Sequence, residues 1–230
     1  MELFFIRHGE SEANQLHVFS NRGLGYPLTP NGRRQAHELA ASLRDEWSSR
    51  EWLGGKSRFF SPVSQIQINR IITSPLSRAV QTAEILAQEL AGPTEAAVSI
   101  EFSEALREFD CGILEGRSDP HSWQLFSALV DAWLAGQERK KRFPGGDSFI
   151  DIQQRFVPFI QSVVQEADPQ ARILLVSHGG LYRCMLPLVL SNIDFKFTCK
   201  NYLGNCEMVR AEVRGEHLVC RGWGRILIDS

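Results

Sequence analysis

Two histidines each follow a short run of apolar residues. The segment RHGES at 7–11 comes directly after the run 3–6, and SHGG at 177–180 comes after the run 173–176. A neutral imidazole nitrogen is a competent nucleophile toward phosphorus, and a guanidinium beside it can hold two phosphoryl oxygens in a bidentate fork. Gly9 removes a side chain where the backbone would have to approach a phosphate closely. The first segment therefore has the groups that phosphoryl transfer requires.

A second arginine lies in a comparable place. Arg78 ends the segment SPLSR at 74–78, which follows a third apolar run at 71–73. It falls just inside the start of an expected helix, where backbone N–H groups also favour anions. A single histidine or arginine of this kind is more often a hydrogen-bonded or surface side chain. Two of each, after three apolar runs, indicate one anion-binding pocket.

The elements that must position these residues can be read from periodicity. The three apolar runs are typical of strands buried on both faces of a sheet. Helices are expected, from apolar stripes at helical spacing or from their place between strands, at about 31–47, 76–91, 122–136, 147–167 and 180–190. This order predicts an α/β fold of three layers, α/β/α, with a mostly parallel sheet and helices on both faces. Ligands in such folds sit at the carboxyl ends of the strands, where both histidines are expected.

Other segments are less regular. Alternating residues at about 206–213 and 217–223, separated by RGE at 214–216, predict an antiparallel hairpin near one edge of the sheet. Residues 48–68 are rich in Ser and Gly and are expected to form a connecting loop. The dense basic run at 139–142 is either part of a lid that meets a second acidic group on the substrate or, more commonly for such runs, a solvated face.

Composition excludes several classes of protein. The chain has 230 residues and a formal charge of −2, so it has no global basic field for nucleic acid or an anionic membrane. No apolar run approaches the roughly 18 residues that span a bilayer, and the N-terminal run is too short for a signal-peptide core. The five cysteines are odd in number and form no CxxC pair, which argues against a disulfide framework and a zinc site. We expect a cytoplasmic protein.

Six segments together resemble the histidine phosphatase superfamily, in its phosphoglycerate-mutase-like branch. They occur in the family's order and reach to about residue 183: RHGES with Asn14 three residues on, PLTPNGRRQA at 27–36, SPLSRAVQTAE at 74–84, LREFDCGILEG at 106–116, PGGDS at 144–148 and SHGG at 177–180. As a set they are highly specific. The resemblance implies one domain over 1–230 with a phosphoglycerate-mutase-like fold and a helical insert or lid at about 117–146. Asp147 stands where PGGES is commoner, and it can still cap the helix that follows.

The resemblance also implies a role for each matching residue. His8 matches the histidine that is phosphorylated, and Glu108 matches the acid that protonates the leaving oxygen and later deprotonates water. His178 matches a second pocket histidine that donates a hydrogen bond to the phosphoryl group. The residues expected to bind phosphoryl oxygens with it are Arg7, Asn14 and Arg78. Further candidates for contact with the substrate are Ser11, Ser20, Asn21, Arg22 and Gly179. No cofactor and no metal are implied, because two arginines and a histidine can stabilise the transferring group.

These features predict a metal-independent hydrolase of small phosphomonoesters that works through a phosphohistidine. Two departures from the mutase pattern favour hydrolysis: the loop FSNRGLGYPLTP lacks a GWxD motif, and Glu108 is followed by FDC rather than by RHY. A cofactor-dependent phosphoglycerate mutase and, further, a non-catalytic protein that binds a phosphorylated ligand stay open as alternatives. The ester and the oligomeric state also stay open. Four aromatic residues either line a pocket for a ring-bearing ester or belong to the core, namely Trp123, Phe126, Trp133 and Phe143.

Overall fold

A mixed β-sheet forms the centre of the computed structural model, which describes residues 1–23, 25–53, 68–91 and 98–228. Its strand order is β3-β2-β4-β1-β5-β6-β7. The strands are β1 (Glu2–Arg7), β2 (Arg70–Thr73), β3 (Ile100–Phe102), β4 (Arg172–Ser177), β5 (Met208–Arg214), β6 (His217–Trp223) and β7 (Ile226–Leu227). The first four run parallel to one another, whereas β5, β6 and β7 pair antiparallel. The predicted parallel core and C-terminal hairpin are therefore confirmed.

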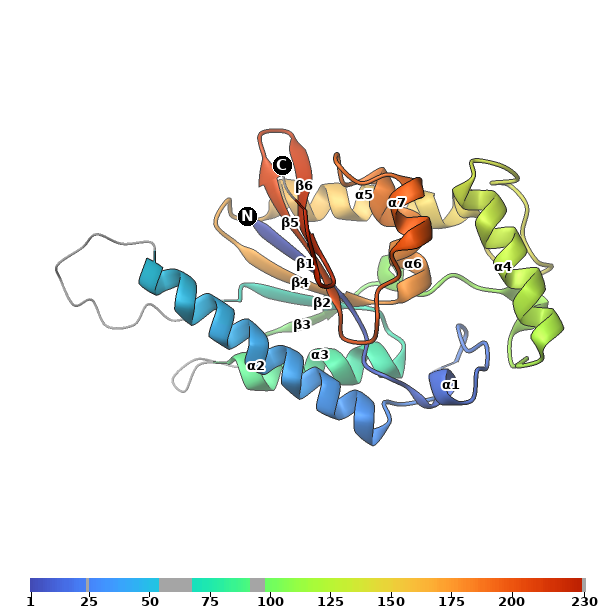
Figure 1. Ribbon diagram of the computed structural model, residues 1–230, viewed down its shortest axis with the longest axis horizontal. Helices are drawn as coiled ribbons and strands as arrows, with labels where there is room; N and C mark the ends of the chain where they lie inside the picture. The colour runs from blue at the N-terminus through green and yellow to red at the C-terminus, as the bar shows by residue number, and fades with distance from the viewer. Residues whose placement is uncertain (24, 54–67, 92–97, 229–230) are drawn as a thin grey trace.

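Successive residues of β1 pack on opposite faces of the sheet. Leu3 and Phe5 belong to one core cluster, and Phe4 and Ile6 belong to another. The first cluster is covered by α5 (Phe149–Glu166) and α6 (Gly179–Met185), and the second by α2 (Pro30–Leu53) and α3 (Ser77–Leu90). Figure 1 shows these two helical layers on either side of the strands. Burial on both faces is the reason that the run 3–6 is continuously apolar, and the three-layer prediction is confirmed.

Three further helices lie outside the two layers or at their rim: α1 (Glu12–Gln15), α4 (Pro120–Leu134) and α7 (Phe195–Lys200). Single 3-10 turns span Glu104–Leu106, Gly112–Leu114 and Leu186–Leu188. The start of α4 is well defined, because the Asp119 carboxylate accepts from Ser122 N and Pro120 occupies the first helical position. In Figure 1, α1 and α4 lie beyond the ends of the parallel strands, on the side where the chain leaves β1.

Two predicted boundaries are wrong. Helix α2 continues to Leu53, so the first residues of the loop expected at 48–68 are helical; positions 54–67 lie outside the described residues. The helix expected over 180–190 ends as an α-helix at Met185 and tightens into a 3-10 turn at Leu186–Leu188. Pro187 has no backbone N–H to continue the α-helical pattern, which accounts for the change.

Asp147 does not cap the helix that follows it. The N-cap of α5 is Ser148, whose hydroxyl accepts from Asp151 N while the Asp151 carboxylate accepts from Ser148 N. The Asp147 carboxylate instead accepts from Asp110 N at 2.9 Å and faces Arg155 at 3.4 Å. The Ser148 and Asp151 capping box satisfies the start of α5 without Asp147. Asp147 instead links the loop after Glu108 to the start of this helix.

Candidate active site

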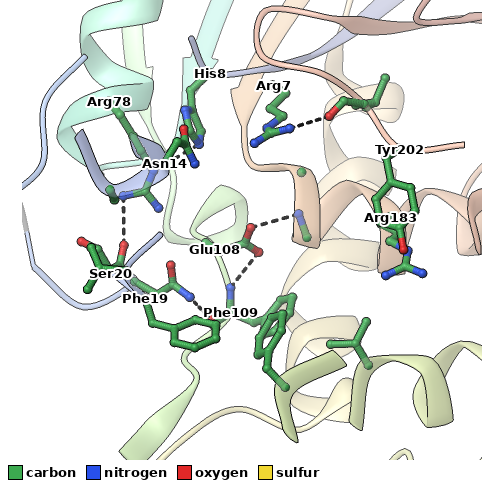
Figure 2. A pocket seen from close by; sticks show the side chains of 18 of the residues that line it. Arg7, His8, Asn14, Phe19, Ser20, Arg78, Glu108, Phe109, Arg183 and Tyr202 are labelled. Carbon is green, nitrogen blue, oxygen red and sulfur yellow. Dashed lines mark hydrogen bonds between the residues drawn. The ribbon is translucent and has the colours of Figure 1, made fainter. Parts of the chain in front are cut away.

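The ends of β1, β4 and the start of α3 bring four predicted residues together. Arg7 and Ser177 are register partners, and His8 N donates to Ser177 O at 2.9 Å, so His8 and His178 leave neighbouring strands side by side. Their ring centroids are 5.1 Å apart. Arg78, at the second residue of α3, reaches the same point from the next strand. Figure 2 shows Arg7, His8 and Arg78 around one pocket.

Two hydrogen bonds define the protonation of the buried His8 imidazole. Its Nδ1 lies 2.7 Å from the Gly9 carbonyl oxygen, and Arg78 Nε donates to its Nε2 at 3.2 Å. A carbonyl can only accept and a guanidinium can only donate, so Nδ1 carries the proton and Nε2 carries the lone pair. Burial, and then the charges of Arg78 and Arg7, hold the pKa of His8 well below its usual range. The ring is therefore neutral and nucleophilic near neutral pH.

Arg78 is fixed by several contacts as well as by burial. Burial lowers its pKa to about 10, which leaves the guanidinium charged at neutral pH. Its Nη1 donates to the Ser20 carbonyl at 2.9 Å. The Thr82 hydroxyl donates to Arg78 O at 2.8 Å and accepts from Gly9 N at 3.1 Å, so α3 also holds the chain beside His8.

Gly9 is required for a reason that sequence reasoning did not find. A Cβ atom there would lie 2.5 Å from the Gly32 carbonyl oxygen. The same is true in reverse, since a Cβ at Gly32 would lie 2.0 Å from Glu10 O. Close packing of the chain after β1 against the start of α2 therefore requires a glycine at this position.

Two buried nitrogens beside His8 have no hydrogen-bond partner, and they are the only such side-chain atoms in the described part of the chain: Arg7 Nε and His178 Nδ1. Arg7 is held through Nη1, which donates to Leu203 O at 2.6 Å, and His178 Nε2 lies 2.7 Å from the Ser74 hydroxyl. Burial, followed by the charge of Arg78, holds the pKa of His178 well below its usual range, so this ring is also neutral. Arg7 and His8 line the pocket, whereas His178 is not a lining residue and lies against the His8 ring. An unpartnered buried polar group costs about 1–3 kcal/mol, and an anion that accepts from both nitrogens would offset that cost.

Asn14 is oriented by bonds to a single oxygen. Its Oδ1 accepts from Ser11 N and Ser11 Oγ, both at 3.1 Å, and from Asn205 Nδ2 at 3.3 Å. The amide NH2 group is thereby left as the donor available to a ligand in the pocket that Asn14 lines. Ser11 itself is buried, begins α1 and is not among the lining residues. Its place in the structure is that of a support for Asn14.

Glu108 lines the pocket as a half-buried carboxyl group. Its Oε1 accepts from Phe109 N at 3.2 Å and its Oε2 accepts from Gly180 N at 3.0 Å. Burial raises the pKa of Glu108, although Arg78 and both N–H groups oppose the rise. A Cβ at Gly180 would lie 2.8 Å from Oε2, so α6 can approach the carboxyl group this closely only through a glycine. The result is a carboxyl group that keeps its proton to a higher pH than an ordinary glutamate.

The remaining candidates divide into two groups. Ser20, Asn21 and Gly179 line the pocket. Asn21 Nδ2 donates to Phe109 O at 3.0 Å, which joins the loop after α1 to the chain after Glu108. Arg22 is not a lining residue, because its guanidinium pairs with Asp110 at 2.7 Å and donates to Gly145 O at 2.6 Å. Arg22 therefore lies outside the pocket, where it links the loop after α1 to Asp110 and Gly145.

The outer walls of the pocket include residues that sequence reasoning missed. The cavity measures about 260 Å³, and its unpredicted lining includes Val18, Phe19, Val130, Arg183 and Tyr202. The position of Arg183, one helical turn beyond Gly180 in the helix that starts after SHGG, was a usable signal, since residues one turn apart share a face. Of the four aromatic residues left open, Trp123 and Phe126 line the pocket. Trp133 is fully buried in the core, and Phe143 packs against it.

The basic run 139–142 does not reach the pocket. Arg139 stacks on the rings of Phe149 and Phe195, with 4.5 and 4.9 Å from its Cζ to the centroids. Lys141 pairs with Glu138 at 2.9 Å, and Arg142 pairs with Asp151 at 3.0 Å. None of residues 139–142 is a lining residue, so of the two interpretations the structure favours a surface face over a contact with the substrate.

The described residues share three general features. No group of three or more His, Cys, Asp or Glu side chains there could hold a metal ion. None of the helices in those same ranges combines the length and apolar character of a membrane span. All five cysteines are free thiols.

Comparison with curated proteins finds relatives over nearly the whole chain. A probable phosphoglycerate mutase GpmB from Proteus mirabilis (strain HI4320) is 28% identical over 229 residues, which cover 97% of this chain and 90% of the relative. The corresponding protein of Salmonella choleraesuis (strain SC-B67) is 27% identical with the same coverage.

Solved structures with the same fold include two that are phosphatases by name. Bacillus stearothermophilus YhfR superposes with a TM-score of 0.72 at 23% identity, covering 98% of this chain and 97% of its own. A phosphoserine phosphatase from Entamoeba histolytica, in complex with 3-phosphoglyceric acid, gives 0.71 at 22% identity, with 98% and 97% covered. A mycobacterial glucosyl-3-phosphoglycerate phosphatase gives 0.70 at 22% identity, with 97% and 98% covered. The model of the histidine phosphatase superfamily (branch 1) matches residues 3–53 and 56–226, so the chain belongs to that family.

Proposed function

We propose that this protein is a metal-independent phosphomonoester hydrolase that transfers the phosphoryl group to His8 Nε2 and then to water. The observation that carries the proposal is the pair of unpartnered buried nitrogens, Arg7 Nε and His178 Nδ1, beside a neutral His8. Buried polar groups are normally hydrogen-bonded, so these two nitrogens indicate a ligand that accepts from them. A phosphoryl group supplies the acceptors that both nitrogens lack, and its phosphorus then lies within reach of the His8 lone pair.

In the first step, the lone pair of His8 Nε2 forms a bond to phosphorus while the bond from phosphorus to the ester oxygen breaks. Arg7, Arg78, Asn14 and His178 stabilise the charge spread over the three equatorial oxygens. An alkoxide is a poor leaving group, so it takes a proton from the Glu108 carboxyl, whose raised pKa keeps that proton available. The alcohol leaves, and a phosphohistidine and a Glu108 carboxylate remain.

In the second step, the Glu108 carboxylate removes a proton from a water molecule as the water oxygen attacks phosphorus. The bond from phosphorus to Nε2 breaks, inorganic phosphate is released and the imidazole returns to its neutral form. The hydrogen bond from Nδ1–H to the Gly9 carbonyl holds the ring in one tautomer through both steps. One carboxyl group thus acts as acid and then as base.

Trapping of the intermediate tests this proposal. Brief incubation with a ³²P-labelled phosphomonoester, followed by denaturation, should yield labelled protein whose label is acid-labile and base-stable. His8→Ala should abolish the label, whereas Arg34→Ala, at an exposed position on α2, should not. Label that persists in His8→Ala would reject His8 as the nucleophile. Loss of hydrolysis in excess chelator would reject the metal-independent route.

The second candidate function is interconversion of phosphoglycerates, and the names of the GpmB relatives favour it. A mutase must keep the phosphoenzyme from water and return the phosphoryl group to a second hydroxyl. Phosphate release measured beside 2- and 3-phosphoglycerate interconversion separates the two. Hydrolysis predicts released phosphate in proportion to ester consumed, and a mutase predicts interconversion with little release.

The proposal extends to the domain organisation and to the location of the protein in the cell. We infer one domain over 1–230 in which α4 and the turns after it, at about 117–146, form an insert over the pocket. Trp123 and Phe126 support this, because they come from α4 and line the cavity. Five free thiols favour a reducing compartment, which makes the cytoplasm the expected location. Thiol titration of protein alkylated in intact cells would test the location, since oxidised cysteines would contradict it.

A further inference from the structure

Four aromatic side chains form a continuous surface on one side of the pocket, and we call Phe19, Phe109, Trp123 and Phe126 the aromatic wall. Phe19 stacks on Trp123 with 4.0 Å between the centroids. Phe109 and Phe126 lie nearly parallel, at 8° and 5.6 Å, and Phe19 is 5.0 Å from Phe126. These rings come from three separate parts of the chain, and all of them line the cavity that contains His8.

Contacts with Trp133 and with the His17 carbonyl fix two rings of the aromatic wall in place. Phe109 packs edge-on against the fully buried Trp133 at 5.6 Å, and Trp123 Nε1 donates to His17 O at 2.8 Å. Phe19 and Phe109 are buried, whereas Trp123 and Phe126 are half-buried. The half-buried rings therefore keep apolar surface open to the cavity, and that surface gains free energy when an apolar group covers it.

The position of Glu108 determines which part of a substrate meets these rings. The ester oxygen must lie within hydrogen-bond reach of Glu108 while phosphorus lies at His8 Nε2, with the attacking and leaving atoms roughly in line. Phe109 follows Glu108 directly in the chain. In Figure 2, Glu108 is seen between His8 on one side and Phe19 and Phe109 on the other. The alcohol part of the ester, rather than the phosphoryl group, therefore faces the aromatic wall.

The charged group in the outer part of the pocket, the Arg183 guanidinium, already has partners within the protein. Apart from the groups assigned to the phosphoryl centre and Glu108, Arg183 is the one charged side chain among the lining residues that the structure describes. Its guanidinium lies 4.2 Å from the Tyr202 ring, donates to Thr198 O at 3.4 Å and lies 3.3 Å from Asp131 Oδ1. A dedicated clamp for a substrate carboxylate would present a guanidinium free for a bidentate contact.

We propose that the preferred substrates are monophosphate esters whose alcohol carries an apolar or aromatic group, and that the aromatic wall binds that group. This specificity rests on the proposed phosphohydrolase function and narrows it to one substrate class. Esters whose alcohol carries a carboxylate, such as phosphoglycerates, lose the apolar contact and meet an arginine that is already paired.

A panel of four primary-alcohol phosphates tests the specificity in the wild-type protein: ethyl phosphate, 2-phenylethyl phosphate, glycerol 3-phosphate and 3-phosphoglycerate. Primary alcohols keep the chemistry of the leaving oxygen similar, so differences in kcat/KM report on the rest of the alcohol. We expect 2-phenylethyl phosphate to exceed ethyl phosphate by about ten- to hundredfold, which is the range for burying one ring. Equal values for these two esters, or a preference for 3-phosphoglycerate that Arg183→Met removes, would overturn the inference.

Variants of the aromatic wall show whether the preference comes from these rings. Trp123→Ala and, independently, Phe126→Leu should each lower the ratio of 2-phenylethyl to ethyl phosphate by about two- to tenfold. Leu125→Ala, on the same helix but exposed and outside the pocket, is the matched control and should leave the ratio unchanged. Thermal unfolding identifies any variant that fails to fold, and the other variant then carries the test. Ratios unchanged in both folded variants would contradict the role of the wall.

Failure of this inference is distinguishable from failure of the proposed function. Absence of any trapped phosphohistidine with all four esters would reject the hydrolase itself. A phosphohistidine that forms at similar rates from ethyl and 2-phenylethyl phosphate would keep the hydrolase and reject only the specificity.

Discussion

Arg78 Nε donates a 3.2 Å hydrogen bond to His8 Nε2, the nitrogen that attacks phosphorus in the proposed reaction. This bond selects the tautomer with a free-base Nε2, but it also occupies the lone pair. Attack on phosphorus requires the guanidinium to exchange this nitrogen for phosphoryl oxygens. Arg78 therefore prepares the nucleophile before the substrate binds and stabilises the transferring group afterwards.

Replacing Arg78 by lysine should lower kcat/KM for an aryl phosphate by about 10²- to 10³-fold, the usual effect of losing one transition-state donor. Lysine keeps the charge but lacks the planar fork that can satisfy Ser20 O and phosphoryl oxygens together. Steady-state kinetics measure the loss. Arg34→Lys, at a side chain that is 65% exposed, is the control and should behave as wild type. An Arg78→Lys protein with at least half of the wild-type kcat/KM would contradict this role.

Glu108→Gln should impair alkyl phosphates by about 10²- to 10⁴-fold and aryl phosphates far less, because only the alkoxide needs a proton on leaving. The wild-type rate should fall as the pH rises through the raised pKa of Glu108, when the acid loses its proton. On the acid side, the lowered pKa of His8 keeps the nucleophile neutral well below pH 6.5. We therefore expect maximal activity on the acid side of the raised pKa of Glu108.

The control for this substitution is Glu104→Gln, at an exposed carboxylate that pairs with Arg107. Kinetics across pH 4–9 should show the alkaline decline in wild type and in the control but not in Glu108→Gln. Second ionisation of the ester itself affects all three proteins alike, so the comparison removes it. Equal losses for alkyl and aryl esters would show that Glu108 is not the acid.

The strands and the phosphoryl-binding centre could be predicted because their constraints are local. A strand buried on both faces must be apolar throughout, as 3–6 and 173–176 are, and the polar residues after parallel strands must meet at one sheet edge. The short strands β3 and β7 and the helices α1 and α7 were not expected. Segments of 2 to 6 residues carry too little periodicity, and their pairing depends on neighbours distant in the chain.

The outer pocket could be predicted only in part, for a different reason. Phe19 lies in a loop, Trp123 in α4 and Arg183 in α6. Their relative placement depends on tertiary packing, and each alone is compatible with a core or surface position. Arg22 was predicted to contact the substrate but does not line the pocket. Its sequence neighbours Ser20 and Asn21 line the pocket, whereas its own side chain pairs with Asp110. Neighbours in a loop need not face the same way, because no fixed period relates them.

Gly180→Ala should act through Glu108 without touching the phosphoryl centre. The added Cβ would lie 2.8 Å from Oε2, 3.0 Å from Oε1 and 3.0 Å from Phe109 Cε1, so the carboxyl group must leave its present position and the Phe109 ring must shift with it. We expect at least a tenfold loss of kcat for alkyl phosphates and a smaller loss for aryl phosphates. Gly25→Ala, where no atom lies within 4 Å of the new Cβ, is the matched control. A Gly180→Ala enzyme with equal losses for both ester classes would mean that the substitution disturbs the fold rather than the acid.

The two buried neutral histidines should make the folded protein sensitive to mild acid. In the unfolded chain each histidine titrates near pH 6.5, whereas burial holds the pKa of His8 and His178 well below that value in the folded state. As the pH falls below about 6.5, the unfolded chain therefore binds protons that the folded chain does not. The free energy of unfolding then falls by up to about 1.4 kcal/mol per pH unit for each histidine.

Glu108 has the opposite effect on the free energy of unfolding as the pH falls. Substitutions separate its contribution from that of the histidines. Its raised pKa means that the folded state keeps a proton which the unfolded state releases above about pH 4.5, so Glu108 offsets part of the loss as the pH falls through its folded pKa. His178→Gln should flatten the dependence of unfolding free energy on pH between 6.5 and 5 by up to about 1.4 kcal/mol per unit, and Glu108→Gln should remove the opposing contribution as the pH falls through the folded pKa of Glu108. Urea titrations at each pH measure these slopes, with His121→Gln, at an exposed histidine, as the control. A slope that is the same in His178→Gln and wild type would mean that His178 already carries its proton in the folded pocket, and it could then not be the neutral donor that the site requires.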